Sequence, residues 1–264
     1  MVTDLLDTGI SSSSRVHVAG CPVDCTDLEA LTNRLCGAIF GHERCDVMGV
    51  NAAFVVDAWR DENYRKVLES AECVPADGFW VAFAARVLGI KGVGHVGIER
   101  LVHRLLERIA PAAKSVFLLG AREEVVREAA AAVQVLYPGI RVLGVQNGYF
   151  QPADEEAIFS EIEAKSPDLI LVGMTSPKKE YWISQYGRRL PAGIVIGVGG
   201  LFDVLAGRVP AAPEWMKTHG LEWLFRFAQD PRRLWRRYVQ GNGKFIWLVF
   251  REWARSRMRR SAIR

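Results

Sequence analysis

The stretch Ser115-Val116-Phe117-Leu118-Leu119-Gly120 is an apolar run that ends in glycine, and a segment with helical periodicity follows it. Apolar runs without polar alternation are typical of strands buried on both faces. The repeating pattern gives strands at 115–120, 140–144, 168–173 and 193–199, with helices at 123–137, at 154–165 and from about 178. Strands separated by helices predict an α/β fold with a Rossmann-like parallel sheet.

A smaller α/β region is predicted before this sheet. Its elements are strands at 16–20 and 45–51 and helices at 27–40, 53–70 and 80–88. The polar tract Ser11-Ser12-Ser13-Ser14 has no apolar face to bury and predicts a frayed terminus. The predicted organisation is a disordered N-terminus (1–15), an N-terminal acceptor and catalytic region (16–110), a nucleotide-binding region (111–215) and a C-terminal appendage (216–264).

The C-terminal appendage is predicted to be helical and basic. From Lys217 to Arg264 the chain has 13 Lys or Arg and three Asp or Glu, a net charge of +10 against +4 for the whole chain. The opening Met1-Val2-Thr3-Asp4 lacks the basic start and apolar run of a secretory signal, so a cytoplasmic protein is expected. No stretch reaches the roughly 18 apolar residues of a membrane-spanning helix.

The five cysteines do not predict a metal site. Cys21, Cys25, Cys36, Cys45 and Cys73 have no paired CxxC spacing and no nearby histidine cluster. Buried free thiols are the expected state.

Glycine follows each strand of the predicted sheet, at Gly120, Gly144, Gly173 and Gly197. Ligands of open α/β sheets bind beyond the carboxyl ends of the strands, where glycine lets backbone N–H groups approach a phosphate. The alternative is that these glycines only allow tight turns. A dinucleotide dehydrogenase is disfavoured, because no GxGxxG follows the first strand with an acid about 20 residues on.

Three parts of the chain carry a family pattern. They are 50–52 with Pro75-Ala76-Asp77-Gly78, then 148–150 with 167–180, and then the stretch from Gly197-Val198-Gly199-Gly200-Leu201-Phe202-Asp203 to Pro231-Arg232-Arg233. Together they resemble the TagA/WecG/CpsF family, glycosyltransferase family 26, over roughly residues 45 to 245. The exopolysaccharide glucosyltransferases of the GumM type are among the members that the chain resembles.

The resemblance implies an inverting transferase with a GT-E-like fold. Such an enzyme moves a hexose-type sugar from a UDP-sugar to a polyprenyl-diphosphate-linked sugar in bacterial exopolysaccharide or cell-surface glycan synthesis, without a metal or other cofactor. Asp77 matches the base that deprotonates the acceptor hydroxyl and is expected to face an enclosed cleft, and Asn51 would orient the donor sugar or the base. The alternative for Asp77 is an ordinary turn residue that caps a backbone N–H.

The same likeness implies the residues that bind the donor. They are Gly120, Ala121, Gly148, Tyr149, Gly173 and Asp203 for the nucleotide, with His95 and Lys179 beside the donor sugar and its diphosphate. Tyr149 offers a flat face to uracil. For Asp203 the alternative is the N-cap of a helix that begins at Val204.

Three positions depart from the family pattern. Gly49 stands where threonine is usual, His95 where arginine is expected, and Lys179 where glutamine is expected. These changes predict a donor other than N-acetylmannosamine. Lys179 would pair with the carboxylate of a uronate or with the diphosphate itself, and a smaller set of contacts would suit plain glucose. They also leave open a catalytically inactive member that binds UDP-sugar or lipid-linked glycan at the membrane.

Aromatic and basic residues interleave from Leu221 to Arg260, a composition typical of amphipathic helices in the headgroup region. The appendage is therefore predicted to hold the protein peripherally on anionic lipid at the cytoplasmic face of the inner membrane. Four arginines are expected to grip the acceptor diphosphate: Arg226, Arg233, Arg236 and Arg237. Nucleic acid is a disfavoured partner, because no exposed stacking platform is evident. An apolar stripe on this segment also favours homo-oligomers.

Overall fold

The computed structural model describes residues 14–190, 193–213, 215–216, 219–229 and 241–261. Its centre is a five-stranded sheet of order β3-β7-β6-β4-β5, in which every neighbouring pair is parallel. The strands are β3 (Arg44–Val47), β4 (Ser115–Gly120), β5 (Arg141–Gln146), β6 (Leu169–Gly173) and β7 (Gly193–Gly197). The predicted Rossmann-like parallel sheet is confirmed.

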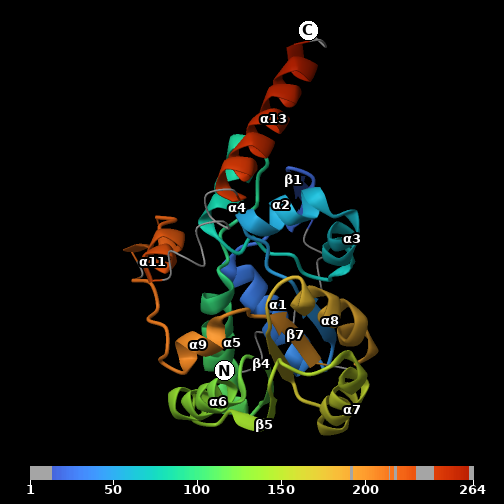
Figure 1. Ribbon diagram of the computed structural model, residues 1–264, viewed down its shortest axis with the longest axis vertical. Helices are drawn as coiled ribbons and strands as arrows, with labels where there is room; N and C mark the ends of the chain where they lie inside the picture. The colour runs from blue at the N-terminus through green and yellow to red at the C-terminus, as the bar shows by residue number, and fades with distance from the viewer. Residues whose placement is uncertain (1–13, 191–192, 214, 217–218, 230–240, 262–264) are drawn as a thin grey trace.

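Helices cover both faces of the sheet (Figure 1). The helices before the C-terminal appendage are α1 (Leu28–Phe40), α2 (Ala52–Arg60), α3 (Glu62–Ser70), α4 (Phe79–Val87), α5 (Ile98–Ile109), α6 (Glu123–Leu136), α7 (Glu155–Lys165), α8 (Lys178–Tyr186) and α9 (Leu201–Leu205). Alternate side chains of β4 point to opposite faces. Phe117 and Leu119 join a core with α7 and α8, whereas Val116 and Leu118 join a second core with α1, α5, α6 and α9.

The order of the strands predicts a ligand crevice at the carboxyl edge of the sheet. The chain runs from β4 to its neighbour β5 and then crosses back to β6 on the other side of β4. In open α/β sheets such a reversal separates the loops that follow the two central strands and leaves room for a ligand. A binding site is therefore expected at the loops that follow β4 and β6.

The N-terminal part of the chain shares this sheet. β3 pairs with β7 as the edge strand, and isolated bridges (Val47 to Cys73, Val50 to Ala76, and Ala76 to His95) continue the parallel pairing beyond its carboxyl end. A separate antiparallel hairpin joins β1 (Arg15–Val18) to β2 (Cys21–Asp24). Its two-residue turn, Ala19-Gly20, has positive φ at both positions, as a tight hairpin requires.

The C-terminal appendage contains α11 (Glu222–Gln229) and α13 (Gly241–Ser261). The first turns of α13 pack on the body through the buried Phe245 and Leu248, and the rest of the helix projects away (Figure 1). None of the helices in the described residues combines the length and the apolarity that a membrane span requires.

Several local predictions differ from the structure. The helix predicted at 53–70 is two helices, because Asp61 leaves the helical conformation and its carboxylate caps α3 at Asn63 N and Tyr64 N. Gly144 lies inside β5 and not at its end. The hairpin strand β2 and the helix α5 were not predicted. Of the predicted disordered terminus, 1–15, only Ser14 and Arg15 are described, and Arg15 opens β1.

Candidate functional site

Asp77 lies at the carboxyl edge of the sheet, beside the end of β3. Its backbone N–H donates to the carbonyl of Val50 at 2.8 Å, which continues the pairing that β3 begins. Its carboxylate Oδ1 accepts a hydrogen bond of 2.9 Å from the backbone N–H of Ile98, the first residue of α5. A helix N-terminus carries partial positive charge, so α5 holds the ionised carboxylate and fixes its direction.

Gly49 is required by the packing around Asp77. A Cβ atom at this position would lie 2.5 Å from Cγ1 and 2.8 Å from Cδ1 of Ile98, and 2.8 Å from Cβ of Asp77. The buried Ile98 side chain therefore occupies the space that a larger residue at position 49 would need. Glycine at position 49, where the family pattern has threonine, leaves room for Ile98. The side chain of Ile98 packs against Asp77, and its backbone N–H donates to the carboxylate.

Asn51 is the N-cap of α2. Its Oδ1 accepts from the backbone N–H groups of Ala53 and Phe54 at 3.0 and 3.4 Å. Asn51 lies directly against Gly78, because a Cβ on that glycine would be 3.7 Å from the Asn51 Cβ. The two predicted catalytic residues are thus neighbours, and the Nδ2 group of Asn51 takes no part in the cap.

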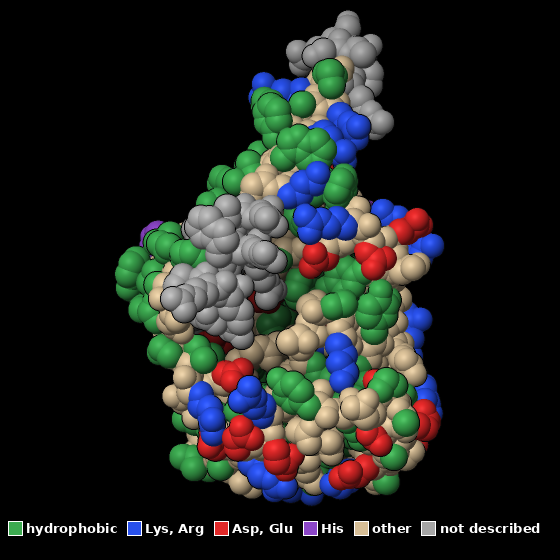
Figure 2. All heavy atoms as spheres, viewed as in Figure 1, with side chains coloured by type: hydrophobic (Ala, Val, Ile, Leu, Met, Phe, Trp, Pro, Cys, Tyr) green, Lys and Arg blue, Asp and Glu red, His purple; other side chains and the backbone are tan. Residues whose placement is uncertain are grey.

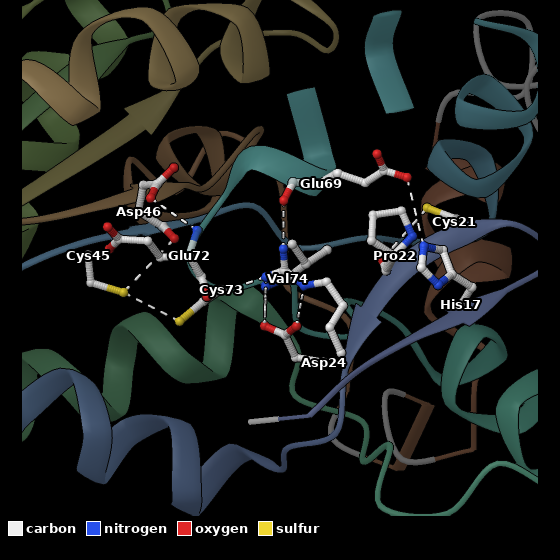
Figure 3. A network of polar contacts seen from close by, with 11 residues as sticks. His17, Cys21, Pro22, Asp24, Cys45, Asp46, Glu69, Glu72, Cys73 and Val74 are labelled. Atoms are coloured by element: carbon white, nitrogen blue, oxygen red, sulfur yellow. Dashed lines mark hydrogen bonds and ion pairs between the residues drawn. The ribbon is translucent and has the colours of Figure 1, made fainter. Parts of the chain in front are cut away.

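Residues 72–74, which lead into Asp77, are hydrogen-bonded to side chains of β2 and β3 (Figure 3). Asp24 Oδ2 accepts from Val74 N at 2.7 Å, and Asp46 Oδ1 accepts from Glu72 N at 3.1 Å. Cys73 also meets Cys45 with 3.3 Å between the sulfurs, and this contact together with burial raises the pKa of the Cys45 thiol well above its usual range. These thiols are therefore structural. Among the described residues no cluster of three or more metal-ligating side chains occurs.

The structure brings four of the predicted nucleotide-binding residues together at the crevice between β4 and β6. Ala121 N donates to Gly173 O at 2.9 Å, and Gly148 N donates to Ala121 O at 2.9 Å. A Cβ at Gly120, where φ is +140°, would lie 2.3 Å from the Gly173 carbonyl oxygen. The close backbone contact therefore requires glycine at position 120. The alternative that the strand-end glycines serve only a steric purpose is enough to explain Gly120.

Asp203 lies near this crevice but is not a helix cap. It is the third residue of α9, which begins at Leu201, so the alternative of an N-cap before Val204 is wrong. The preceding Phe202 is buried, and a Cβ on Gly173 would lie 2.5 Å from its ring. Asp203, the residue after Phe202, is half-buried.

Tyr149 is 74% exposed and lines a surface pocket of ≈ 400 Å³ after β5. The lining is Gln146, Asn147, Tyr149, Phe150, Asp154, Ala157, Ile158 and Glu161. Neither this pocket nor a smaller one of ≈ 120 Å³ at the opposite edge of the sheet is lined by Asp77, whose enclosed cleft stays a prediction.

Lys178 is a cation of this region that was not singled out from the sequence. Its Nζ donates to the carbonyl of Gly148 at 3.1 Å and lies 4.0 Å from the centre of the Phe150 ring. It therefore joins the first turn of α8 to the loop after β5. Its place in the motif 174–180, directly after a strand end, was the available signal.

His95 and Lys179 have different surroundings. His95 pairs with Ala76 beside the Asp77 loop, and its Nδ1 is 3.2 Å from Arg100 Nη2. Lys179 is 3% exposed, forms an ion pair with the fully buried Glu180, and lies over the ring of Phe54. A donor carboxylate would have to displace Glu180 inside the core, so the geometry argues against the uronate hypothesis for Lys179.

The predicted acceptor-binding arginines lie outside the described structure. Arg233, Arg236 and Arg237 fall in 230–240, and only the backbone of Arg226 is described, within α11. Their predicted role stays a prediction.

Comparison with known proteins identifies the family of this chain. The model of the Glycosyl transferase WecG/TagA/CpsF family matches residues 16–259. The N-acetylglucosaminyldiphosphoundecaprenol N-acetyl-beta-D-mannosaminyltransferase of Bacillus spizizenii is 30% identical over 193 residues, which cover 73% of this chain and 74% of that protein. The protein of the same name from Bacillus subtilis (strain 168) is 31% identical over 190 residues, covering 72% and 73%. Because the match spans the sheet, the Asp77 loop and most of α13, the chain belongs to the WecG/TagA/CpsF family of glycosyltransferases.

Proposed function

We propose that the protein transfers a neutral hexose-type sugar from a UDP-sugar to a polyprenyl-diphosphate-linked N-acetylglucosamine, with inversion, in the synthesis of a bacterial exopolysaccharide or another cell-surface glycan. The proposal rests on Asp77, whose carboxylate accepts a hydrogen bond from the N-terminus of α5. Asp77 lies on the same edge of the sheet as Gly120, Gly148 and Gly173. The two relatives are named for a lipid-linked N-acetylglucosamine acceptor, which supports this acceptor here.

Asp77 serves as the base in this proposal. Oδ1 is held by Ile98 N, and Oδ2 would accept the proton of the acceptor hydroxyl as that oxygen attacks the anomeric carbon. The bond from the anomeric carbon to the UDP oxygen breaks on the opposite face of the sugar, and UDP leaves with the bonding electron pair. The Nδ2 group of Asn51 would bind a sugar hydroxyl or the attacking oxygen.

The donor would lie along the carboxyl edge of the sheet. The N-termini of α6 and α8, which follow β4 and β6, suit its diphosphate, and Tyr149 would contact the uracil. The sugar then points toward β3, which is three strand positions or roughly 15 Å from β4. A neutral sugar fits best, because the charge of Lys179 is already matched by Glu180.

We also propose that the protein works peripherally at the cytoplasmic face of the inner membrane, with α13 on anionic lipid. The described part of α13 places exposed apolar side chains such as Ile246 and Phe250 among cations such as Arg255 and Arg257. Such a helix binds an anionic interface through both its apolar area and its charge.

A donor and acceptor panel tests the reaction. Purified protein is mixed with UDP-glucose, UDP-N-acetylglucosamine, UDP-N-acetylmannosamine or UDP-glucuronate and with polyprenyl-diphosphate-linked N-acetylglucosamine or glucose, and lipid products are detected by mass. A hexose product on the N-acetylglucosamine acceptor is expected, and it should persist after dialysis against EDTA if no metal is needed. No product from any pair, despite measured UDP binding, would refute the proposal and favour the catalytically inactive member that the change at His95 leaves open.

A further inference from the structure

Helix α4 is apolar on its outer face as well as on its inner one. Val81, Ala84 and Ala85 are buried in the core, as expected for a helix that packs on the body. On the other side, Trp80, Phe83 and Val87 are 40%, 42% and 43% exposed, at a spacing that places them on one stripe. Arg86 is the one charged residue of this nine-residue helix. A contiguous exposed apolar stripe indicates a contact surface.

This stripe adjoins the root of α13. Buried side chains of α4 and the α13 residues Phe245 and Leu248 belong to the same apolar core, and Figure 1 shows α4 beside the base of the projecting helix. Lys244 fixes that base, because its Nζ lies 3.9 Å from the Trp59 ring centre on α2 and 4.2 Å from that of Trp247. The stripe of α4 and the root of α13 thus lie at the same end of the molecule (Figure 1).

The charge beside the stripe identifies its partner. Helix α13 has six basic residues and one acidic residue, a net formal charge of +5. Figure 2 shows Lys and Arg side chains among hydrophobic side chains along the described part of the helix. Arg251 and Arg257 lie over the rings of Trp247 and Trp253, at 4.9 and 4.5 Å. Aromatic rings with cations beside them, and one acid against six basic residues, match the headgroup region of an anionic bilayer.

The position of α4 links this surface to catalysis. The helix begins directly after Gly78, next to Asp77, and its nine residues span about 13 Å at 1.5 Å per residue. A bilayer that receives Phe83 and Val87 would therefore hold its phosphates close to the Asp77 loop. This depth suits an acceptor whose diphosphate lies at the headgroup level and whose chain stays in the membrane.

We infer that the exposed face of α4, formed by Trp80, Phe83 and Val87, inserts into the surface of an anionic bilayer as a second membrane contact beside α13, and that it sets the height of the Asp77 loop above the lipid. The inference rests on the proposed function for its lipid-linked acceptor. The membrane contact itself rests only on the apolar face and the charge beside it.

The full chain carrying Phe83→Ser and Val87→Ser tests the inference. Trp80 is left intact, because its Nε1 donates to Gly220 O at 3.1 Å and its loss would disturb the fold. The matched control is Val135→Ser with Leu136→Ser, two side chains on α6 that are 77% and 56% exposed at the end of the molecule opposite to α13 (Figure 1). Binding is measured by co-sedimentation with phosphatidylglycerol and phosphatidylethanolamine vesicles at low and high salt.

The α4 variant should bind these vesicles about tenfold more weakly than the wild type or the control, because two apolar side chains lose their burial. High salt should release it completely, whereas the wild type keeps a salt-resistant part of its binding. Transfer to a polyprenyl acceptor in vesicles should fall, while transfer to a short-chain, water-soluble acceptor stays unchanged.

Equal vesicle binding by the α4 variant and the control would overturn the inference. A wild-type dimer that the α4 variant dissociates without vesicles, seen by sedimentation velocity, would also overturn it and assign the face to a second copy. Failure of the wild type to use the short-chain acceptor refutes the proposed function, and it does so independently of the vesicle result.

Discussion

The two ends of the candidate site are built in different ways. At β4 and β6, backbone meets backbone, since the absent Cβ of Gly120 leaves room for the Gly173 carbonyl. At β3, side chains form the site, since Asp77 accepts a hydrogen bond from α5 and Asn51 caps α2. A glycine at a strand end therefore marks a steric need. The carboxylate of Asp77 accepts a backbone N–H at a helix N-terminus, where partial positive charge stabilises it, and this bond alone also fits the capping alternative.

The largest effect is expected from Asp77→Asn, which keeps the shape of the β3 end and removes its base. The turnover rate should fall by roughly 10²- to 10⁴-fold, the usual contribution of a general base. UDP binding, measured by calorimetry, should not change, because the proposed nucleotide site is at the other end of the sheet edge. Asp57→Asn, an exposed carboxylate on α2, is the control. An active Asp77→Asn enzyme would leave the β3 end without a catalytic role.

The steric need for glycine at the strand ends is tested by comparing two variants, Gly120→Ala and Gly199→Ala. Both positions have positive φ, but a Cβ at Gly199 meets nothing within 4 Å. We expect Gly120→Ala to lower the free energy of unfolding by about 4 kcal/mol, through both clash and strain. Gly199→Ala should cost only about 1 kcal/mol, from strain alone. Equal shifts in urea denaturation would show that the contact with Gly173 is unimportant.

A double-mutant cycle examines how the β3 end positions Asp77. Gly49→Ala should push Ile98 away, lengthen its hydrogen bond to Asp77 and reduce turnover about tenfold, because misplacement of a reacting group is costly. Ile98→Ala removes Cγ1 and Cδ1, the atoms that would clash, although the lost burial should lower stability by about 3 kcal/mol. The double variant should therefore be faster than Gly49→Ala alone. Additive losses in turnover would break the proposed link.

The smallest effect on turnover is expected at the opposite edge of the sheet, where Asp168 binds Ser115 N, Ser115 Oγ and Lys114 Nζ at 2.8, 2.7 and 2.9 Å. Burial tends to raise the pKa of Asp168, but these hydrogen bonds and Lys114 outweigh it and lower the pKa below its ordinary value. Its stabilisation is therefore complete above the unfolded pKa of about 3.9 and is lost as the pH falls toward the folded pKa.

Asp168→Asn should reduce stability by about 2 kcal/mol at neutral pH and should leave turnover unchanged. The difference between the variant and the wild type should shrink below about pH 4, as urea denaturation across a pH series would reveal. A difference that stays constant to pH 2 would contradict this account.

The sheet was predictable because strands buried on both faces have a continuous apolar pattern that local sequence carries. The gathering of Gly120, Ala121, Gly148 and Gly173 followed from it, since parallel strands end at one edge. The bond between Asp77 and Ile98 joins residues 21 positions apart and depends on how α5 packs. The apolar spacing of Ile98, Leu101, Val102, Leu105, Leu106 and Ile109 was an available signal for α5, which was not predicted, but it carries no information on the partner of the first N–H of that helix.

Other local features depended on tertiary packing. The motif around Lys179 did not reveal that its helix turns this lysine into the core toward Glu180. The family resemblance placed this lysine beside the donor, and its burial also runs against the usual preference of lysine for the surface. The break at Asp61 had a signal, an N-cap residue within a helical pattern, that the apolar spacing on either side masked.

The packing of Gly49 against Ile98 also constrains how this protein could have evolved. In a relative with a larger residue at position 49, isoleucine at 98 would have to move from the place that it holds here, because the two side chains would claim the same volume beside Asp77. A path that shrinks position 49 first therefore costs less than one that places isoleucine at 98 first, and reversal at position 49 is easier once position 98 is smaller. Sterics thus favour one order of substitutions, and we expect the two positions to change together across lineages.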